Sequence, residues 1–123
     1  MNKQKVFNTV SQHLLTQNYK AEDERGNCSY RTGEGLKCAI GCLIPDELYT
    51  SRIEGKLVPC GLFGFINSVE HQLIEILRKA IGVEDKDDLI FLNELQMIHD
   101  CSHPDDWEIK LKAFAEKHQL KYT

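Results

Sequence analysis

The sequence lacks both a long apolar run and a secretory leader. No uninterrupted apolar stretch approaches the roughly 20 residues that a membrane-spanning helix needs. The residues from Met1 to Lys5 lead into an amphipathic pattern and not into a solid apolar block, which argues against a signal peptide. We therefore expect a soluble, cytoplasmic protein that has no membrane partner.

Clustered positive charge is also missing. The 15 Lys and Arg residues are dispersed along the chain, and the formal net charge is -4. Binding to nucleic acid relies on clustered Lys and Arg that contact phosphates, so we expect no nucleic-acid partner. The acidic groups at 84–88 and 105–106 stand where helices are expected to begin, where they complement the helix dipole.

The chain has no Cys-x-x-Cys pair and no common catalytic signature. Its five cysteines are an odd number, and the cytoplasm keeps thiols reduced, so a disulfide framework is not expected. There is no phosphate-binding Walker loop, dinucleotide fingerprint, Gly-x-Ser-x-Gly elbow or His-Glu-x-x-His helix. These absences argue against an ATPase, a dehydrogenase or a common hydrolase, and no cofactor is expected.

What is present is typical of one globular domain that spans residues 1–123. A chain of 123 residues with 41% hydrophobic and 28% charged residues can bury a substantial core. Periodicity predicts a mainly α (α+β) fold of about five helices. The predicted helices cover residues 3–18, 38–44, 67–82, 86–101 and about 104–118, with one further turn over 45–49 and a capping box made by Asn67 and Glu70.

A small β-hairpin is predicted near residues 28–38. Cys28 to Arg31 and Leu36 to Cys38 would form its two short strands, and the glycines between them would permit the chain reversal. The residues from Arg52 to Phe65 hold Gly and Pro at several positions and are predicted to form a loop. A loop of this length is often functional.

The segment from Cys38 to Cys42 is the most distinctive part of the chain. Its side chains are small except for Ile40, and Gly41 in a helix would cost about 1 kcal/mol relative to Ala. Tight packing must offset that cost. We therefore predict that Tyr30 or Trp107 packs closely against this segment.

Two chemical roles can be written for the same cysteines. Cys38 at the start of a helix is a candidate nucleophile, with His99 as its base and Asp100 orienting the imidazole. Alternatively, Cys38 and Cys42 with His99 and His103 form two pairs at i,i+4 spacing, which would suit structural zinc. Structural burial of the cysteines is the simpler interpretation of both patterns, and no metal is expected.

Polar and aromatic residues surround the small-residue segment. Tyr and Arg are favoured at binding hot spots, and acidic residues follow Pro45 directly. The predicted binding residues are Tyr30, Arg31, Asp46, Glu47, Tyr49 and Glu54.

The motif Cys-x-Tyr-Arg at 28–31, followed by Lys-Cys-Ala-Ile-Gly-Cys-Leu-Ile-Pro-Asp at 37–46, resembles a group of small uncharacterised proteins of bacteriophage and bacterial genomes. Leu-Gln-x-x-His-Asp at 95–100 and Trp107 are similar to that group as well. The likeness runs from the first helix to the last and is weakest over 57–65. It implies a phage or mobile-element setting and no mechanism.

The leading functional hypothesis is a non-enzymatic binding protein. Its partner would be a host or defence protein, which it modulates or inhibits, or a small molecule captured beside the hairpin. The alternatives are the Cys38 enzyme and, second, the structural zinc protein.

Overall fold

The computed structural model describes residues 1–55 and 68–122, and this part of the chain is mainly helical, as predicted. It contains four α-helices and not about five: α1 (Lys3–Gln17), α2 (Ser68–Ile81), α3 (Lys86–Cys101) and α4 (Trp107–Lys117). Single 3₁₀ turns add η1 (Gly41–Leu43), η2 (Asp46–Leu48), η3 (Ser51–Ile53) and η4 (Pro104–Asp106).

The predicted helix over 38–44 is the one that does not form. It is reduced to the three residues of η1, because Ile44 takes an extended conformation (φ -96°, ψ 115°). A residue that precedes proline is biased towards extended conformations, and Pro45 follows here. The further turn predicted over 45–49 is present as η2. The capping box of Asn67 and Glu70, and the predicted loop beyond Gly55, lie outside the described residues.

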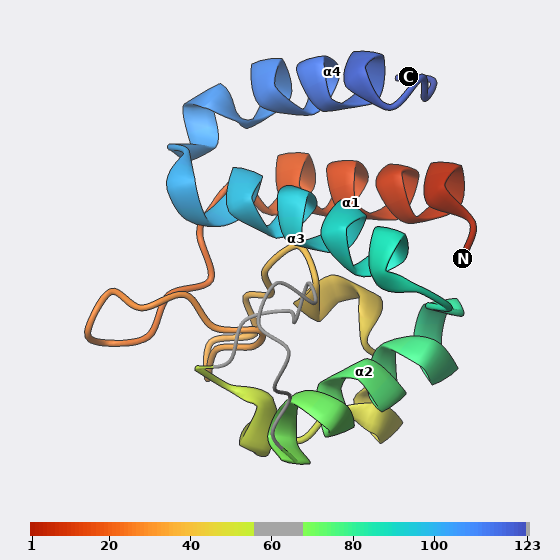
Figure 1. Cartoon of the computed structure of the whole chain (residues 1–123). Helices are drawn as coiled ribbons and strands as arrows, with labels where there is room; N and C mark the ends of the chain where they lie inside the picture. The colour runs from red at the N-terminus through yellow and green to blue at the C-terminus, as the bar shows by residue number, and fades with distance from the viewer. Residues whose placement is uncertain (56–67, 123) are drawn as a thin grey trace.

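Helices α1, α3 and α4 pack together, and α2 lies at the opposite end of the molecule, against η1 and η3 (Figure 1). Aromatic rings join the three helices. Phe7 of α1 stacks on Phe114 of α4 with ring centroids 5.7 Å apart, and Phe91 of α3 meets Phe114 edge-on at 5.1 Å. Trp107, at the start of α4, is fully buried. This core anchors the ends of α1 and α3, which in turn hold the irregular segment between α1 and η1.

The predicted β-hairpin is not present, because the described residues contain no sheet. Residues 21–38 instead form two consecutive tight turns, each closed by one isolated antiparallel bridge: Glu22 with Cys28, and Arg31 with Lys37. The chain does reverse where the glycines predicted it, at Thr32 to Gly35. Beside each bridge one further backbone hydrogen bond forms, from Ser29 N–H to the Ala21 carbonyl and from Cys38 N–H to the Tyr30 carbonyl. The N–H groups of Ala21, Tyr30 and Lys37 bond instead to side chains of other elements.

The two turns repeat each other at an offset of nine residues. Asp23 N–H donates to the Asn27 carbonyl in the first turn, and Thr32 N–H donates to the Leu36 carbonyl in the second. The side chains of Asp23 and Thr32 accept the N–H groups of Asn27 and Leu36 at 3.0 Å. Each turn also has a glycine at positive φ, Gly26 at 82° and Gly35 at 89°. The irregular segment is therefore two copies of one local structure.

The close packing predicted at Gly41 is confirmed. A Cβ atom at this position would lie 1.9 Å from the backbone oxygen of Tyr30 and 2.8 Å from the Tyr30 carbonyl carbon. Gly41 is buried, and its φ is not in the left-handed region, so space and not conformation requires glycine here. The contact is made by the Tyr30 backbone and holds the second turn against η1.

Candidate functional site

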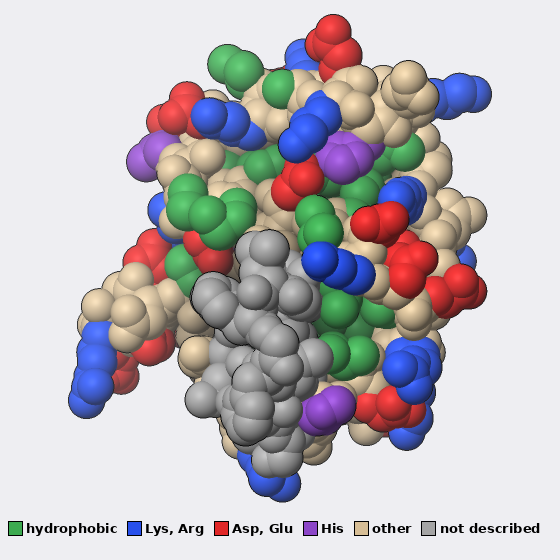
Figure 2. Space-filling model, viewed as in Figure 1, with side chains coloured by type: hydrophobic (Ala, Val, Ile, Leu, Met, Phe, Trp, Pro, Cys, Tyr) green, Lys and Arg blue, Asp and Glu red, His purple; other side chains and the backbone are tan. Residues whose placement is uncertain are grey.

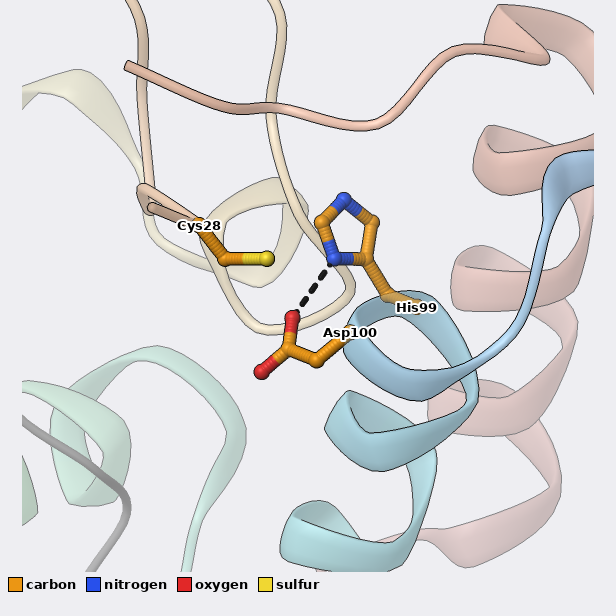
Figure 3. A group of neighbouring side chains, drawn as sticks. All are labelled: Cys28, His99 and Asp100. Carbon is orange, nitrogen blue, oxygen red and sulfur yellow. Dashed lines mark hydrogen bonds and ion pairs between the residues drawn. The ribbon is translucent and has the colours of Figure 1, made fainter. Parts of the chain in front are cut away.

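The end of α3 holds the two turns through a chain of hydrogen bonds that starts at His99. The imidazole is fully buried and stacks on Trp107, with ring centroids 5.4 Å apart. Its Nε2 accepts the Ala21 N–H at 3.0 Å, and its Nδ1 donates to Asp100 Oδ1 at 2.7 Å. An acceptor at Nε2 and a donor at Nδ1 describe the neutral tautomer with its proton on Nδ1. Figure 3 shows the His99–Asp100 pair and the thiol of Cys28 that points towards it.

Gln96 extends this group one turn earlier on α3. Its Nε2 donates to Asp100 Oδ1 at 2.8 Å, and its Oε1 accepts the Ile40 N–H at 3.0 Å. Gln96 is 7% exposed. Ala21 and Ile40 stand at either end of the double turn, where the backbone has no regular partner. A buried N–H without an acceptor is costly, so the side chains of α3 supply the missing hydrogen bonds.

Asp100 is held ionised by its neighbours. Burial alone would raise the pKa of this carboxyl, but hydrogen bonds from His99, Cys28 and Gln96 outweigh burial and hold the pKa below its usual range. The pKa of the Cys28 thiol is shifted in the opposite direction. Burial, followed by the hydrogen bond to Asp100, raises the pKa of the Cys28 thiol to about 12. Cys28 is therefore a neutral thiol that donates to a carboxylate.

This geometry speaks against the predicted Cys38, His99 and Asp100 enzyme. Cys38 is 1% exposed, its Sγ accepts the Gly41 N–H at 3.3 Å, and burial raises the pKa of its thiol to about 12. Both His99 nitrogens are already bonded to Ala21 and Asp100, so the imidazole has no free lone pair to act as a base. The thiol beside Asp100 is that of Cys28, which the sequence did not single out as reactive.

The predicted zinc ligands do not form a cluster within the described residues. One group there could bring three ligand atoms together, Cys28, His99 and Asp100, whose atoms lie within 4.8 Å of one another. A metal on His99 Nδ1 would move the imidazole proton to Nε2, where it would face the Ala21 N–H. Two donors would then oppose each other. His103, the other predicted imidazole ligand, has a side chain that is 70% exposed.

Alkylation of the native protein tests these thiol assignments. With iodoacetamide at pH 7.5 we expect the exposed Cys101 to react first among the four cysteines that the structure describes. Burial raises the pKa values of Cys28, Cys38 and Cys42 to about 12 each. These three thiols should therefore react at least about a hundredfold more slowly than Cys101. Peptide mapping by mass spectrometry measures each rate, and labelling in denaturant is the control in which all sites react alike. Fastest labelling at Cys38 would restore the nucleophile hypothesis.

The predicted binding residues meet at a second group, centred on Glu54. Its carboxylate accepts the Tyr30 N–H at 2.8 Å and the Arg31 N–H at 3.1 Å, and the Tyr49 hydroxyl donates to it at 2.5 Å. Burial, followed by the hydrogen bond to Glu54, raises the pKa of Tyr49 to about 12. Glu54 thus joins the second turn to the segment after η3, and its three bonds are structural.

The Arg31 side chain lies beside this group. The guanidinium stacks over the Tyr49 ring, 4.4 Å from its centroid, and donates to the Ile44 carbonyl at 2.7 Å. It also pairs with Asp46 at 2.8 Å, where the Arg31 side chain is 17% exposed and the Asp46 side chain 85%. Arg31 Nε is buried and has no acceptor among the described residues. Tyr30, Arg31, Asp46, Tyr49 and Glu54 are therefore neighbours, and Glu47 is exposed next to Asp46 on η2.

The double turn borders two hollows. A cleft of about 620 Å³ runs along both turns and is lined by charged residues that include Glu22, Glu24, Arg25, Arg31 and Glu34. The turn closed by Glu22 and Cys28 projects from the body of the molecule, with acidic and basic side chains along it (Figures 1 and 2). A second hollow, of about 580 Å³, lies on the side of α3 and includes Cys28, Gln96 and Asp100 in its wall.

Sequence reasoning missed Gln96, Cys28 and Gln17 as structural residues. The Gln17 side chain bonds both the N–H and the carbonyl of Lys37, at 3.0 and 2.9 Å. The repeated pattern of Asp23 with Gly26 and Thr32 with Gly35 was a usable signal, because a side-chain acceptor three residues before glycine favours this kind of turn. It would have predicted two turns in place of a hairpin.

No family model, curated protein or solved structure matches the chain. Among the described residues, no helix combines the length and apolar character needed to cross a membrane.

Proposed function

We propose that the chain is a non-enzymatic binding protein that contacts a partner protein through the Arg31 face. This face consists of Arg31, Asp46, Glu47 and Tyr49. The resemblance to proteins of phage and bacterial genomes extends the proposal to the kind of partner, a host or defence protein that the chain modulates or inhibits.

The observation that carries the proposal is the environment of the Arg31 guanidinium, which is held in one orientation beside a mostly exposed carboxylate. Stacking on Tyr49 and the bond to the Ile44 carbonyl fix its orientation. Its ion pair is with Asp46, a carboxylate that is mostly in water. Such exposed pairs add about 0–1 kcal/mol of stability, and the buried Arg31 Nε has no acceptor among the residues that the structure describes. Fold stability alone therefore gives weak reason for an arginine at this position. Arg and Tyr with fixed orientation lose little freedom on binding, which favours them at interfaces.

The acidic residues of η2 complete the face. Asp46 and Glu47 are both exposed, whereas Leu48 packs against the core, so η2 is held in place by Leu48 and presents two acidic side chains to solvent. Arg31 also lines the charged cleft along the double turn. A partner surface that carries Lys or Arg opposite η2 would complement this charge.

Charge reversal on η2 tests the proposal without disturbing the core. Partners of the tagged chain are recovered from bacterial cells, and the affinity of each is measured with purified proteins. We expect at least one partner that binds saturably. Its Kd should rise at least about tenfold with Asp46→Lys plus Glu47→Lys, since two rim charges are inverted. Glu108→Lys on α4, whose carboxylate is also exposed, is the matched control and should leave the Kd unchanged.

Two results would contradict the proposed face. One is a partner whose Kd is unchanged by the charge reversal on η2 but rises with Glu108→Lys. The other is that no protein binds saturably. Thermal melting of the double variant should fall only slightly below the parent, because the Arg31–Asp46 pair that it breaks is exposed at Asp46 and such pairs add about 0–1 kcal/mol.

A further inference from the structure

The hollow beside α3 has the size of a small-molecule site. Its volume is about 580 Å³, within the range of about 300–1,000 Å³ usual for such sites. Buried residues form the inner wall, among them Tyr30, Cys38 and Gln96, which are 6%, 1% and 7% exposed. The first turn forms the outer wall with Asp23, Gly26, Asn27, Cys28 and Ser29, and Glu54, Gly55 and Asp100 complete the lining.

The charge on the wall has one sign. Asp23, Glu54 and Asp100 contribute carboxylates, and no Lys, Arg or His belongs to the lining among the described residues. Lys20 is the cation beside it, and its Nζ donates to the backbone carbonyl of Asp100 at 3.2 Å and not to the carboxylate. The Arg31 guanidinium is engaged with Tyr49, Ile44 and Asp46. The field inside the hollow therefore favours a positively charged guest.

Asp100 and Asp23 each keep one carboxylate oxygen without an N–H or O–H donor among the described residues, and Asp100 is the more buried of the two. Glu54 already accepts three hydrogen bonds, from Tyr30, Arg31 and Tyr49. Asp100 Oδ1 accepts from His99 and Gln96, and the Cys28 thiol also donates to this carboxylate, whereas no N–H or O–H group of the described residues donates to Oδ2. A carboxylate has about four lone-pair sites, so Oδ2 can accept an ammonium or guanidinium N–H that enters the hollow.

We propose that this hollow binds a small organic cation, an amine or guanidinium compound, whose charged end contacts Asp100 Oδ2. The Cys38 and Tyr30 side chains face the carbon skeleton of the ligand, and the neutral Cys28 thiol borders its polar end. The site is separate from the Arg31 face, and it does not depend on a partner protein.

Titration calorimetry with matched small molecules tests the site. The probes are butylamine, putrescine and agmatine, with butanol and butyrate as the neutral and anionic counterparts of similar size. We expect saturable binding of at least one cation with a Kd below about 1 mM, and at least about tenfold weaker binding of butanol and butyrate. A charge-assisted hydrogen bond of about 1.5–3 kcal/mol corresponds to such a factor.

Two variants assign the binding to this hollow. Asp100→Asn should weaken the cation at least about tenfold, whereas Asp46→Asn, which removes an exposed carboxylate elsewhere, should not. Because Asp100→Asn can destabilise the fold, Ser29→Phe, which places a ring in the hollow, is the second variant and should abolish binding. The thermal melting temperature is recorded for each variant.

Several outcomes would overturn the proposal. Equal binding of butanol and butylamine would remove the charge argument, and cation binding that survives Ser29→Phe would place it elsewhere. Tighter binding of Zn²⁺ than of every amine, lost with Cys28→Ser, would make the hollow a metal site. No saturable binding by any cation would show that the carboxylates are structural. None of these results bears on the Arg31 face.

Discussion

Replacing Gly41 with alanine is expected to unfold the protein or to remove most of its stability. The new Cβ would lie 1.9 Å from the Tyr30 carbonyl oxygen, and that oxygen belongs to backbone held on both sides. Glu54 bonds the N–H groups of Tyr30 and Arg31, and the Tyr30 oxygen itself accepts the Cys38 N–H. The second turn would have to leave η1 to make room. We expect a loss of about 3 kcal/mol or more, out of the roughly 5–15 kcal/mol typical of a domain.

Gly33→Ala is the matched control for this substitution. Gly33 lies in the same double turn, a Cβ there would meet nothing within 4 Å, and its φ is not in the left-handed region. We expect no loss of stability, or a gain of up to about 1 kcal/mol because alanine restricts the unfolded chain. Urea unfolding followed by circular dichroism measures both variants. Equal stability of Gly41→Ala and the parent would mean that the contact between Tyr30 and Gly41 is not tight.

His99→Ala is the second substitution with a large expected effect. It leaves the Ala21 N–H without its acceptor, deprives Asp100 of a donor and opens a void against Trp107. An unsatisfied buried polar group costs about 1–3 kcal/mol, and a core void adds to that cost. We therefore expect a loss of about 3–5 kcal/mol in the free energy of unfolding, measured by urea titration.

His71→Ala separates this effect from a general effect of removing histidine. His71 is exposed on α2, so its replacement should change stability by no more than about 0.5 kcal/mol. A loss at His99→Ala as small as that at His71→Ala would contradict the structural role of the imidazole. An additional check is the amide proton of Ala21, which should exchange much faster in His99→Ala than in the parent.

Helical periodicity was a good guide where the chain is regular. It predicted α1, α3 and α4 within a few residues, because a stripe of apolar side chains on one face must be buried. It failed at Cys38 to Ile44, where the preference of the residue before Pro45 and the contact between Gly41 and Tyr30 decide the conformation. The small residues predicted that a neighbour packs closely here, but they did not indicate that the segment would form only a single 3₁₀ turn.

The sequence predicted which site residues lie close together better than it predicted their chemical roles. Five of the six predicted binding residues meet around Glu54 and Arg31, as their positions around the small-residue segment suggested. His99 and Asp100 are adjacent and hydrogen-bonded, as the catalytic hypothesis required, but the partner of His99 Nε2 is a backbone N–H. Which group faces a histidine nitrogen depends on the tertiary fold, so the sequence could not distinguish a base from a structural residue.

The hydrogen bonds from α3 to the double turn also set an order of events in folding. The amides of Ala21 and Ile40 find their acceptors 78 and 56 residues further along the chain, on a helix made much later in synthesis. The double turn is therefore not expected to persist on a nascent chain that ends before α3. A nascent chain of this kind would expose the Lys37 to Pro45 segment to proteases and chaperones until the last third of the protein emerges.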